Sequence, residues 1–87
     1  MHIREALRLA REFGAFTAAQ AAYILGMPVA EARERLERFV YNGLLKAVDV
    51  AGVRFYYRDP VEAAEVILSS VDIAALPREE RRRLANL

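Results

Sequence analysis

The chain has 87 residues, of which 55% are hydrophobic, and a formal net charge of +1. Its length allows one small domain, and its composition is that of a globular protein rather than a disordered one. The small net charge counts against tight non-specific binding of nucleic acid, and the absence of cysteine excludes disulfides and thiolate metal sites.

The first predicted element is a helix over residues 2–13, in which apolar residues recur at helical spacing and which Gly14 ends. Residues 1–5 already belong to this amphipathic pattern, so we expect no secretory signal. No apolar run approaches the roughly 20 residues that span a bilayer. We therefore expect a cytoplasmic protein without a membrane partner. Ala15-Phe16 follows as a short extended segment and a candidate edge strand.

The next two helices are predicted to be close neighbours. Thr17 suits the N-cap of a helix over residues 18–25, and Gln20 completes a capping box with it. Gly26 ends this helix, and after a turn of about three residues a third helix covers Pro28 to Asn42. This short connection is the spacing of a helix-turn-helix.

The third helix has one apolar and one charged face at about 100° per residue. The inner stripe contains Val29, Ala32, Leu36, Phe39 and Val40. The outer face contains Glu31, Glu34, Arg35, Arg38 and Tyr41. Its glutamates precede arginines by four residues, the favourable order for ion pairs, so this face suits either a self-paired solvated surface or a binding surface.

Residues 44–50 and 53–58 are rich in valine and aromatic residues and predict a β-hairpin. A two-residue loop, Ala51-Gly52, would pair Asp49 with Arg54, although alanine is poor at positive φ. A three-residue loop with the glycine in the left-handed region shifts every pair and stays open as an alternative.

Alternation along the second hairpin strand directs one or two of the aromatic residues 55–57 inward, with Phe55 in the core. Asp59 then caps a fourth helix that begins near Pro60. Its apolar stripe contains Ala63, Ala64, Ile67, Leu68 and Val71. Pro77 opens a last short helix over residues 78–85.

This order of elements, with Thr17–Met27 as second helix and turn, resembles the winged helix-turn-helix family. Ala32–Leu36 resembles its recognition helix and Gly43–Leu45 the entry to its wing. The resemblance covers about residues 3–70. It implies a mostly α fold with a small antiparallel β-hairpin, in which a three-helix core carries a two-stranded wing and is followed by C-terminal helices. The expected domains are a winged helix-turn-helix at 1–70 and a C-terminal helical extension at 71–87.

In that family the third helix enters the major groove and its N-terminal half reads base edges. Carried over by position, the resemblance implies that the readers are Val29, Ala30, Arg33 and Glu34. Of these, only Arg33 is a typical guanine reader. The expected contacts to phosphate are Thr17, Tyr41, Lys46, Arg54 and Arg58.

The C-terminal run has three interpretations. It contains Arg78, Arg81, Arg82 and Arg83, offset by Glu79 and Glu80. These residues can form a charged helix face or a basic arm on DNA phosphate. The neighbouring apolar residues Ile73, Leu76, Leu84 and Leu87 suggest a dimerisation strip instead.

Catalysis finds little support in the sequence. His2 stands alone, Ser69 and Ser70 have no nearby base, and no cluster has metal-ligand spacing. We therefore predict a protein that is not an enzyme and has no cofactor or metal. The leading hypothesis is a small transcription regulator that binds double-stranded DNA, as a dimer through its first and C-terminal helices. The alternative is a protein–protein interaction module, suggested by the neutral third helix and the apolar hairpin tip Val50–Val53.

Overall fold

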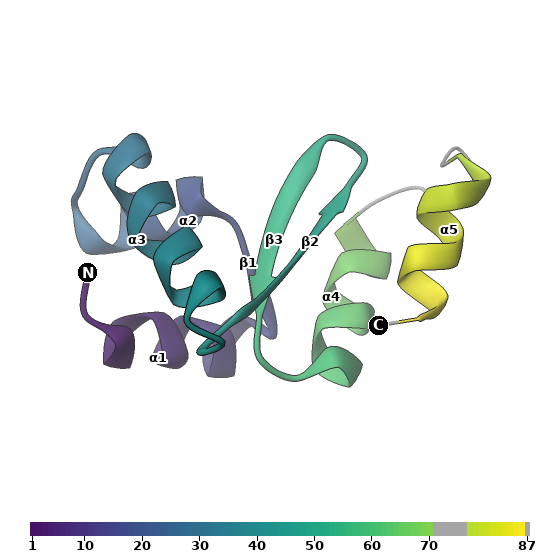
Figure 1. Ribbon diagram of the computed structural model, residues 1–87, viewed down its shortest axis with the longest axis horizontal. Coiled ribbons are helices and arrows are strands. Elements are labelled where there is room, and N and C mark those ends of the chain that lie inside the picture. Colours follow the sequence, from purple (N-terminus) through teal and green to yellow (C-terminus); the bar gives the residue numbers. More distant parts are fainter. Residues whose placement is uncertain (71–76, 87) are drawn as a thin grey trace.

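The computed structural model describes residues 1–70 and 77–86. It is mostly helical with one small antiparallel sheet. In chain order the elements are α1 Ile3–Phe13, β1 Ala15–Phe16, α2 Ala18–Leu25, α3 Val29–Tyr41, β2 Lys46–Val50, β3 Val53–Tyr57, α4 Pro60–Ser70 and α5 Arg78–Ala85. Figure 1 shows the hairpin of β2 and β3 in the middle of the molecule, with α1 to α3 on one side and α4 and α5 on the other. Within these residues we find no helix with both the length and the hydropathy that a membrane span requires.

Local capping signals set the helix ends close to the predicted positions. The Thr17 backbone N–H donates to Gln20 Oε1 at 2.8 Å and the Gln20 N–H donates to Thr17 Oγ1 at 3.2 Å, which confirms the capping box. Helix α1 begins one residue later than predicted, because His2 is its N-cap and shares a second capping box with Glu5. Pro28 likewise precedes α3 as its N-cap.

The sheet has three strands in the order β1-β3-β2, all antiparallel. The predicted hairpin is confirmed with the two-residue loop, because Asp49 pairs with Arg54 and Val50 with Val53. The loop residue Ala51 has a φ of 53°, in the left-handed region. In the alternative three-residue loop, a glycine would have occupied that region. The predicted edge strand β1 pairs with β3. Strand β3 is therefore central, and the sheet has three strands, one more than the hairpin alone.

Both faces of this sheet are covered, and two apolar clusters result. One unites α1, α2 and α3 with the sheet and contains Ala6, Leu9, Ala10, Phe16, Ala18, Ala21, Leu36, Leu45 and Tyr56. The other joins α4 to the opposite face and contains Ala15, Val50, Phe55, Tyr57, Ala63 and Ile67. All three aromatic residues of β3 are therefore buried, which corrects the prediction that only one or two point inward.

Val29 and Leu68, which the periodicity placed in apolar stripes, are substantially exposed, at 42% and 41%, and so is Phe13 at the end of α1, at 40%. Each lies in the first or last turn of its helix, beyond the part that packs against a neighbour. Leu9 is buried in the first cluster, and Val66 packs against the second. The predicted stripe residue Val71 lies outside the described residues.

Candidate nucleic-acid interface

Helix α3 presents the predicted base readers on its open surface. Ala30, Arg33 and Glu34 are exposed, and Val29 is half-exposed at the first turn. Glu34 is already engaged, because its carboxylate accepts a hydrogen bond from Arg38 at 3.3 Å, as the i,i+4 spacing predicts. The guanidinium of Arg33 forms no ion pair with any described residue. Arg33 is therefore the available cation among the four predicted readers.

A hollow of about 220 Å³ unites residues from three parts of the chain. It lies between the start of α2, the first half of α3 and the start of β3. Its lining contains Thr17, Ala18, Ala19, Arg33, Val53, Arg54 and Tyr56. Three of the predicted DNA contacts, Thr17, Arg33 and Arg54, thus surround one depression although up to 37 residues separate them in the sequence.

Residues at the N-terminus of α2 line this hollow. The first four backbone N–H groups of a helix have no partner inside the helix. Here the Gln20 N–H donates to the Thr17 side chain and the Ala21 N–H to the Thr17 carbonyl. The N–H groups of Ala18 and Ala19 have no hydrogen-bond partner among the described residues. Such a helix end attracts anions.

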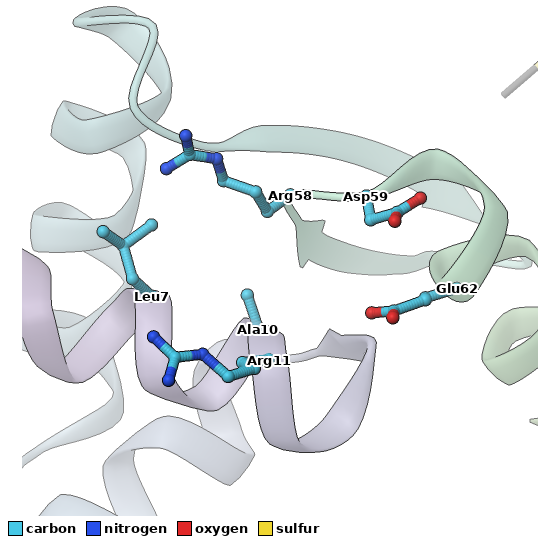
Figure 2. Close-up of a pocket in the computed structure, with 6 residues that line it drawn as sticks. All are labelled: Leu7, Ala10, Arg11, Arg58, Asp59 and Glu62. Carbon is cyan, nitrogen blue, oxygen red and sulfur yellow. The ribbon is translucent and has the colours of Figure 1, made fainter.

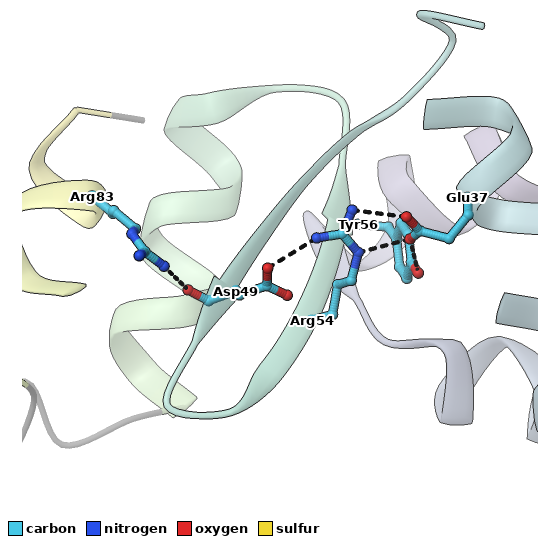
Figure 3. Close-up of polar contacts among 5 residues, drawn as sticks. All are labelled: Glu37, Asp49, Arg54, Tyr56 and Arg83. Carbon is cyan, nitrogen blue, oxygen red and sulfur yellow. Dashed lines mark hydrogen bonds and ion pairs between the residues drawn. The ribbon is translucent and has the colours of Figure 1, made fainter. Parts of the chain in front are cut away.

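Arg54 is held by two carboxylates and is less available than the sequence suggested. Its Nε and Nη2 atoms donate to the two carboxylate oxygens of Glu37 at 2.7 and 2.8 Å, and Nη1 donates to Asp49 Oδ2 at 3.0 Å. The Tyr56 hydroxyl also donates to Glu37, and the Arg54 guanidinium lies 5.8 Å from the centre of the Tyr56 ring. Figure 3 shows these side chains as one continuous network from α3 across the hairpin.

The network changes the acid–base properties of its members. The hydrogen bond from Arg54 holds the pKa of Glu37 below its usual value. The same hydrogen bond, from the other side, raises the pKa of Arg54. Burial, followed by the hydrogen bond to Glu37, raises the pKa of Tyr56 to about 12. At neutral pH the group is therefore an ionised carboxylate between a guanidinium and a neutral phenol.

Glu37 is the residue that the sequence analysis missed. It is one helical turn after Arg33, at the edge of the inner stripe of α3, so both face β3. Its position between the apolar and charged faces was the available signal, because a half-buried glutamate needs a partner. Its partners Arg54 and Tyr56 are 17 and 19 residues away, on a strand whose register the sequence left open.

The other predicted contacts lie elsewhere. Tyr41, 91% exposed, is about 18 Å along α3 from Val29 at 1.5 Å per residue. Lys46 is exposed at the start of β2. Arg58 follows β3 and lies about 17 Å along the strand direction from Val53. It lines a different hollow with α1 and α4 (Figure 2).

The arginines of the C-terminal basic run lie on α5. Arg78, Arg81, Arg82 and Arg83 are exposed on α5. The guanidinium of Arg83 donates to the Asp49 carbonyl at 3.5 Å, so α5 reaches the hairpin strand β2 (Figure 3). The side chains of the predicted dimerisation strip lie outside the described residues.

Within the described part of the chain, no group of three or more histidine, aspartate or glutamate side chains could hold a metal ion. Comparison with known proteins identifies no family: no family model, curated protein or solved structure matches the chain significantly.

Proposed function

We propose that the chain is a winged-helix module that binds double-stranded DNA through α3, the start of α2 and the hairpin, and acts as a transcription regulator. One observation carries the proposal. Ala18, Ala19 and Arg33 line one hollow beside the exposed start of α3. Among the described residues, Arg33 forms no ion pair and the N–H groups of Ala18 and Ala19 have no hydrogen-bond partner. A DNA phosphate has the charge and the acceptor oxygens that these donors require.

In this proposal the hollow receives a backbone phosphate, and the first half of α3 lies along the major groove. Ala30 and Glu34 are then the side chains nearest to base edges. Alanine can contact a thymine methyl and glutamate can accept from a cytosine amino group. Arg54 positions the hairpin against α3 rather than gripping phosphate, because Glu37 and Asp49 already balance its charge.

Fluorescence polarisation with a labelled random-sequence duplex, measured at two salt concentrations, tests the proposal. With Arg33 as the cation that faces a phosphate in this proposal, the logarithm of affinity should fall with the logarithm of salt concentration with a slope of about −1. Arg33→Ala should weaken binding by about tenfold, the loss of one charge-assisted contact. The control is Arg8→Ala, which removes an exposed arginine from α1. Affinity that is independent of salt, or equal losses for the two variants, would refute the proposed contact.

Sequence reading needs its own experiment. Selection of bound duplexes from a random pool should enrich one short motif if Ala30 and Glu34 contact bases. Enrichment of no motif would restrict the proposal to binding through the DNA backbone.

A second candidate, a winged-helix protein–protein interaction module, has one observation in its favour. The charges beside the hairpin are largely balanced within the chain, since Glu34 pairs with Arg38 and Arg54 with Glu37 and Asp49. The double variant Arg33→Ala/Arg35→Ala separates the candidates. A DNA-binding protein should lose its duplex affinity, whereas an interaction module should keep its protein partner in co-purification.

A further inference from the structure

A second hollow, of about 260 Å³, lies where the end of α1, the residues after β3 and the start of α4 meet. Its floor consists of Leu7 and the buried Ala10, and its charged rim consists of Arg11, Arg58, Asp59 and Glu62. In Figure 2 the guanidinium groups of Arg11 and Arg58 extend on the Leu7 side, and the Glu62 carboxylate points in from the opposite side. The hollow therefore has a cationic side, an acidic side and an apolar floor.

The four charged side chains of this rim form no ion pairs with one another. Neither guanidinium forms an ion pair with a described residue, although two carboxylates share the hollow. Asp59 is occupied as the cap of α4, where its Oδ1 accepts from the Val61 N–H at 2.9 Å. Two guanidinium groups that lie on one side of a hollow, with no ion-pair partner among the described residues, are suited to an external anion.

The acidic side limits what that anion can be. Glu62 would repel a phosphate or a stretch of DNA backbone, whereas it would attract an ammonium group. The volume of about 260 Å³ is below the range of pockets for drug-sized ligands. A small molecule with an anionic end, a cationic end and an apolar body matches all of these features.

We propose that this hollow binds an α-amino acid with an apolar side chain. Its carboxylate lies between the guanidinium groups of Arg11 and Arg58, its ammonium group faces Glu62, and its side chain covers Leu7 and Ala10. The site is independent of the proposed DNA contact, because it lies at the other end of β3 and shares no residue with the first hollow. Bound ligand would link α1 to the start of α4.

Three matched probes test each half of the site: L-leucine, 4-methylpentanoic acid, which lacks the amino group, and 3-methylbutylamine, which lacks the carboxylate. Binding to the full chain is followed by amide chemical shifts in NMR spectra. L-leucine should give saturable shifts near Arg11 and Glu62, with a Kd on the order of 1 mM. Each analogue should bind about tenfold more weakly, because it leaves one charged side of the hollow without a partner.

Two variants assign the contacts. Arg58→Gln and Glu62→Gln should each weaken L-leucine binding about tenfold, and Arg8→Gln, on α1 but outside the hollow, should leave it unchanged. Circular dichroism checks that each variant is folded. The absence of saturable shifts at about 20 mM L-leucine, some twentyfold above the expected Kd, would overturn the proposal. Equal affinity for 4-methylpentanoic acid, or unchanged binding by Glu62→Gln, would also overturn it.

Discussion

The pair between Glu37 and Arg54 should stabilise the fold by more than a surface ion pair does. Exposed pairs typically contribute about 0.2–1 kcal/mol, and hydrogen bonds to charged groups about 1.5–3 kcal/mol. Here two contacts of 2.7 and 2.8 Å join side chains that remain 41% and 36% exposed. Because solvent still screens both groups, we expect a coupling energy of about 1–1.5 kcal/mol, between the two ranges.

A double-mutant cycle measures this coupling directly. The variants are Glu37→Ala, Arg54→Ala and their combination, with unfolding by urea followed by far-ultraviolet circular dichroism. The pair of Glu34 with Arg38 is a matched control, because it has the same chemistry but a 3.3 Å contact and side chains 70% and 59% exposed. Its coupling should be about 0.3–0.5 kcal/mol. Equal couplings for the two pairs would refute the reasoning from geometry and burial.

The single substitution Glu37→Ala should cost more than the coupling alone. It also removes the acceptor of the Tyr56 hydroxyl, in a residue that is 1% exposed. Leaving a buried donor without a partner costs about 1–3 kcal/mol, so the total should reach about 2–4 kcal/mol. Glu37→Gln keeps an acceptor oxygen for Tyr56 and should be milder.

Acid should weaken the same pair. The pKa of Glu37 is lowered in the folded protein by its hydrogen bond from Arg54. Its contribution is therefore present above the pKa of the unfolded chain and is lost as pH falls through the lower folded value. The cycle measured from about pH 5 towards about pH 2 should show the coupling disappear. A coupling that persists at the acid end would contradict this assignment.

Three further predictions concern the backbone and the buried phenol. In urea unfolding, Gly14→Ala should lower the free energy of unfolding by about 1–3 kcal/mol more than Gly26→Ala does. Both glycines have positive φ, but only at Gly14 would a Cβ meet Val66 Cγ2, at 2.9 Å. Equal losses for the two variants would contradict the close approach of Gly14 to α4. Ala51→Asn should stabilise by about 0.5–1 kcal/mol in the same assay, because asparagine tolerates the left-handed region better; a loss would argue against this loop. Tyr56 has its pKa raised to about 12, so its stabilisation is complete below about pH 10 and is lost as pH rises through about 12. The stability difference between the protein and Tyr56→Phe should therefore shrink over that interval, and a constant difference would exclude the shift.

Local signals predicted much of the fold. Thr17 and Gln20 identified the start of α2 because a capping box is written in four consecutive residues. Gly14 and Gly26 identified helix ends because few other residues adopt positive φ. The hairpin followed from its valine and aromatic content, but its register did not. Ala51 adopts a positive φ, which alanine disfavours. The register is therefore set by the pairing of the strands and not by the preference of the loop residues.

The burial of β3 could not be predicted from its own residues. Alternation assigns side chains to two faces of a strand but does not say how many faces are covered. Tyr56 packs with α1 to α3, which are distant along the chain, while Phe55 and Tyr57 pack with α4, the helix that follows β3. Only the three-dimensional arrangement, with β1 and β2 on either side, makes β3 the central strand and covers its three aromatic residues on both faces.

The surroundings of the predicted contact residues could not be derived from the sequence either. The resemblance assigned Arg33 to base edges and Arg54 and Arg58 to phosphates, and the structure gives the three arginines different partners. Arg54 is bound by Glu37 and Asp49, Arg58 belongs to another hollow, and Arg33 remains available beside α2. Whether an arginine is available to a ligand depends on which carboxylates lie next to it in the folded protein. Those carboxylates can be far away in the sequence.

The Glu37 network gives the proposed interface a fixed geometry. Glu37 joins α3 to β3 through Arg54 and Tyr56, and Arg54 continues to β2 through Asp49. Arg33 stands one turn before Glu37 on the same side of α3, so this linkage also sets the position of Arg33 relative to the hairpin. A surface that is held in place before binding loses less conformational entropy when a partner arrives. Glu37→Ala should therefore weaken duplex binding without removing any cation, a loss that a purely electrostatic interface would not show.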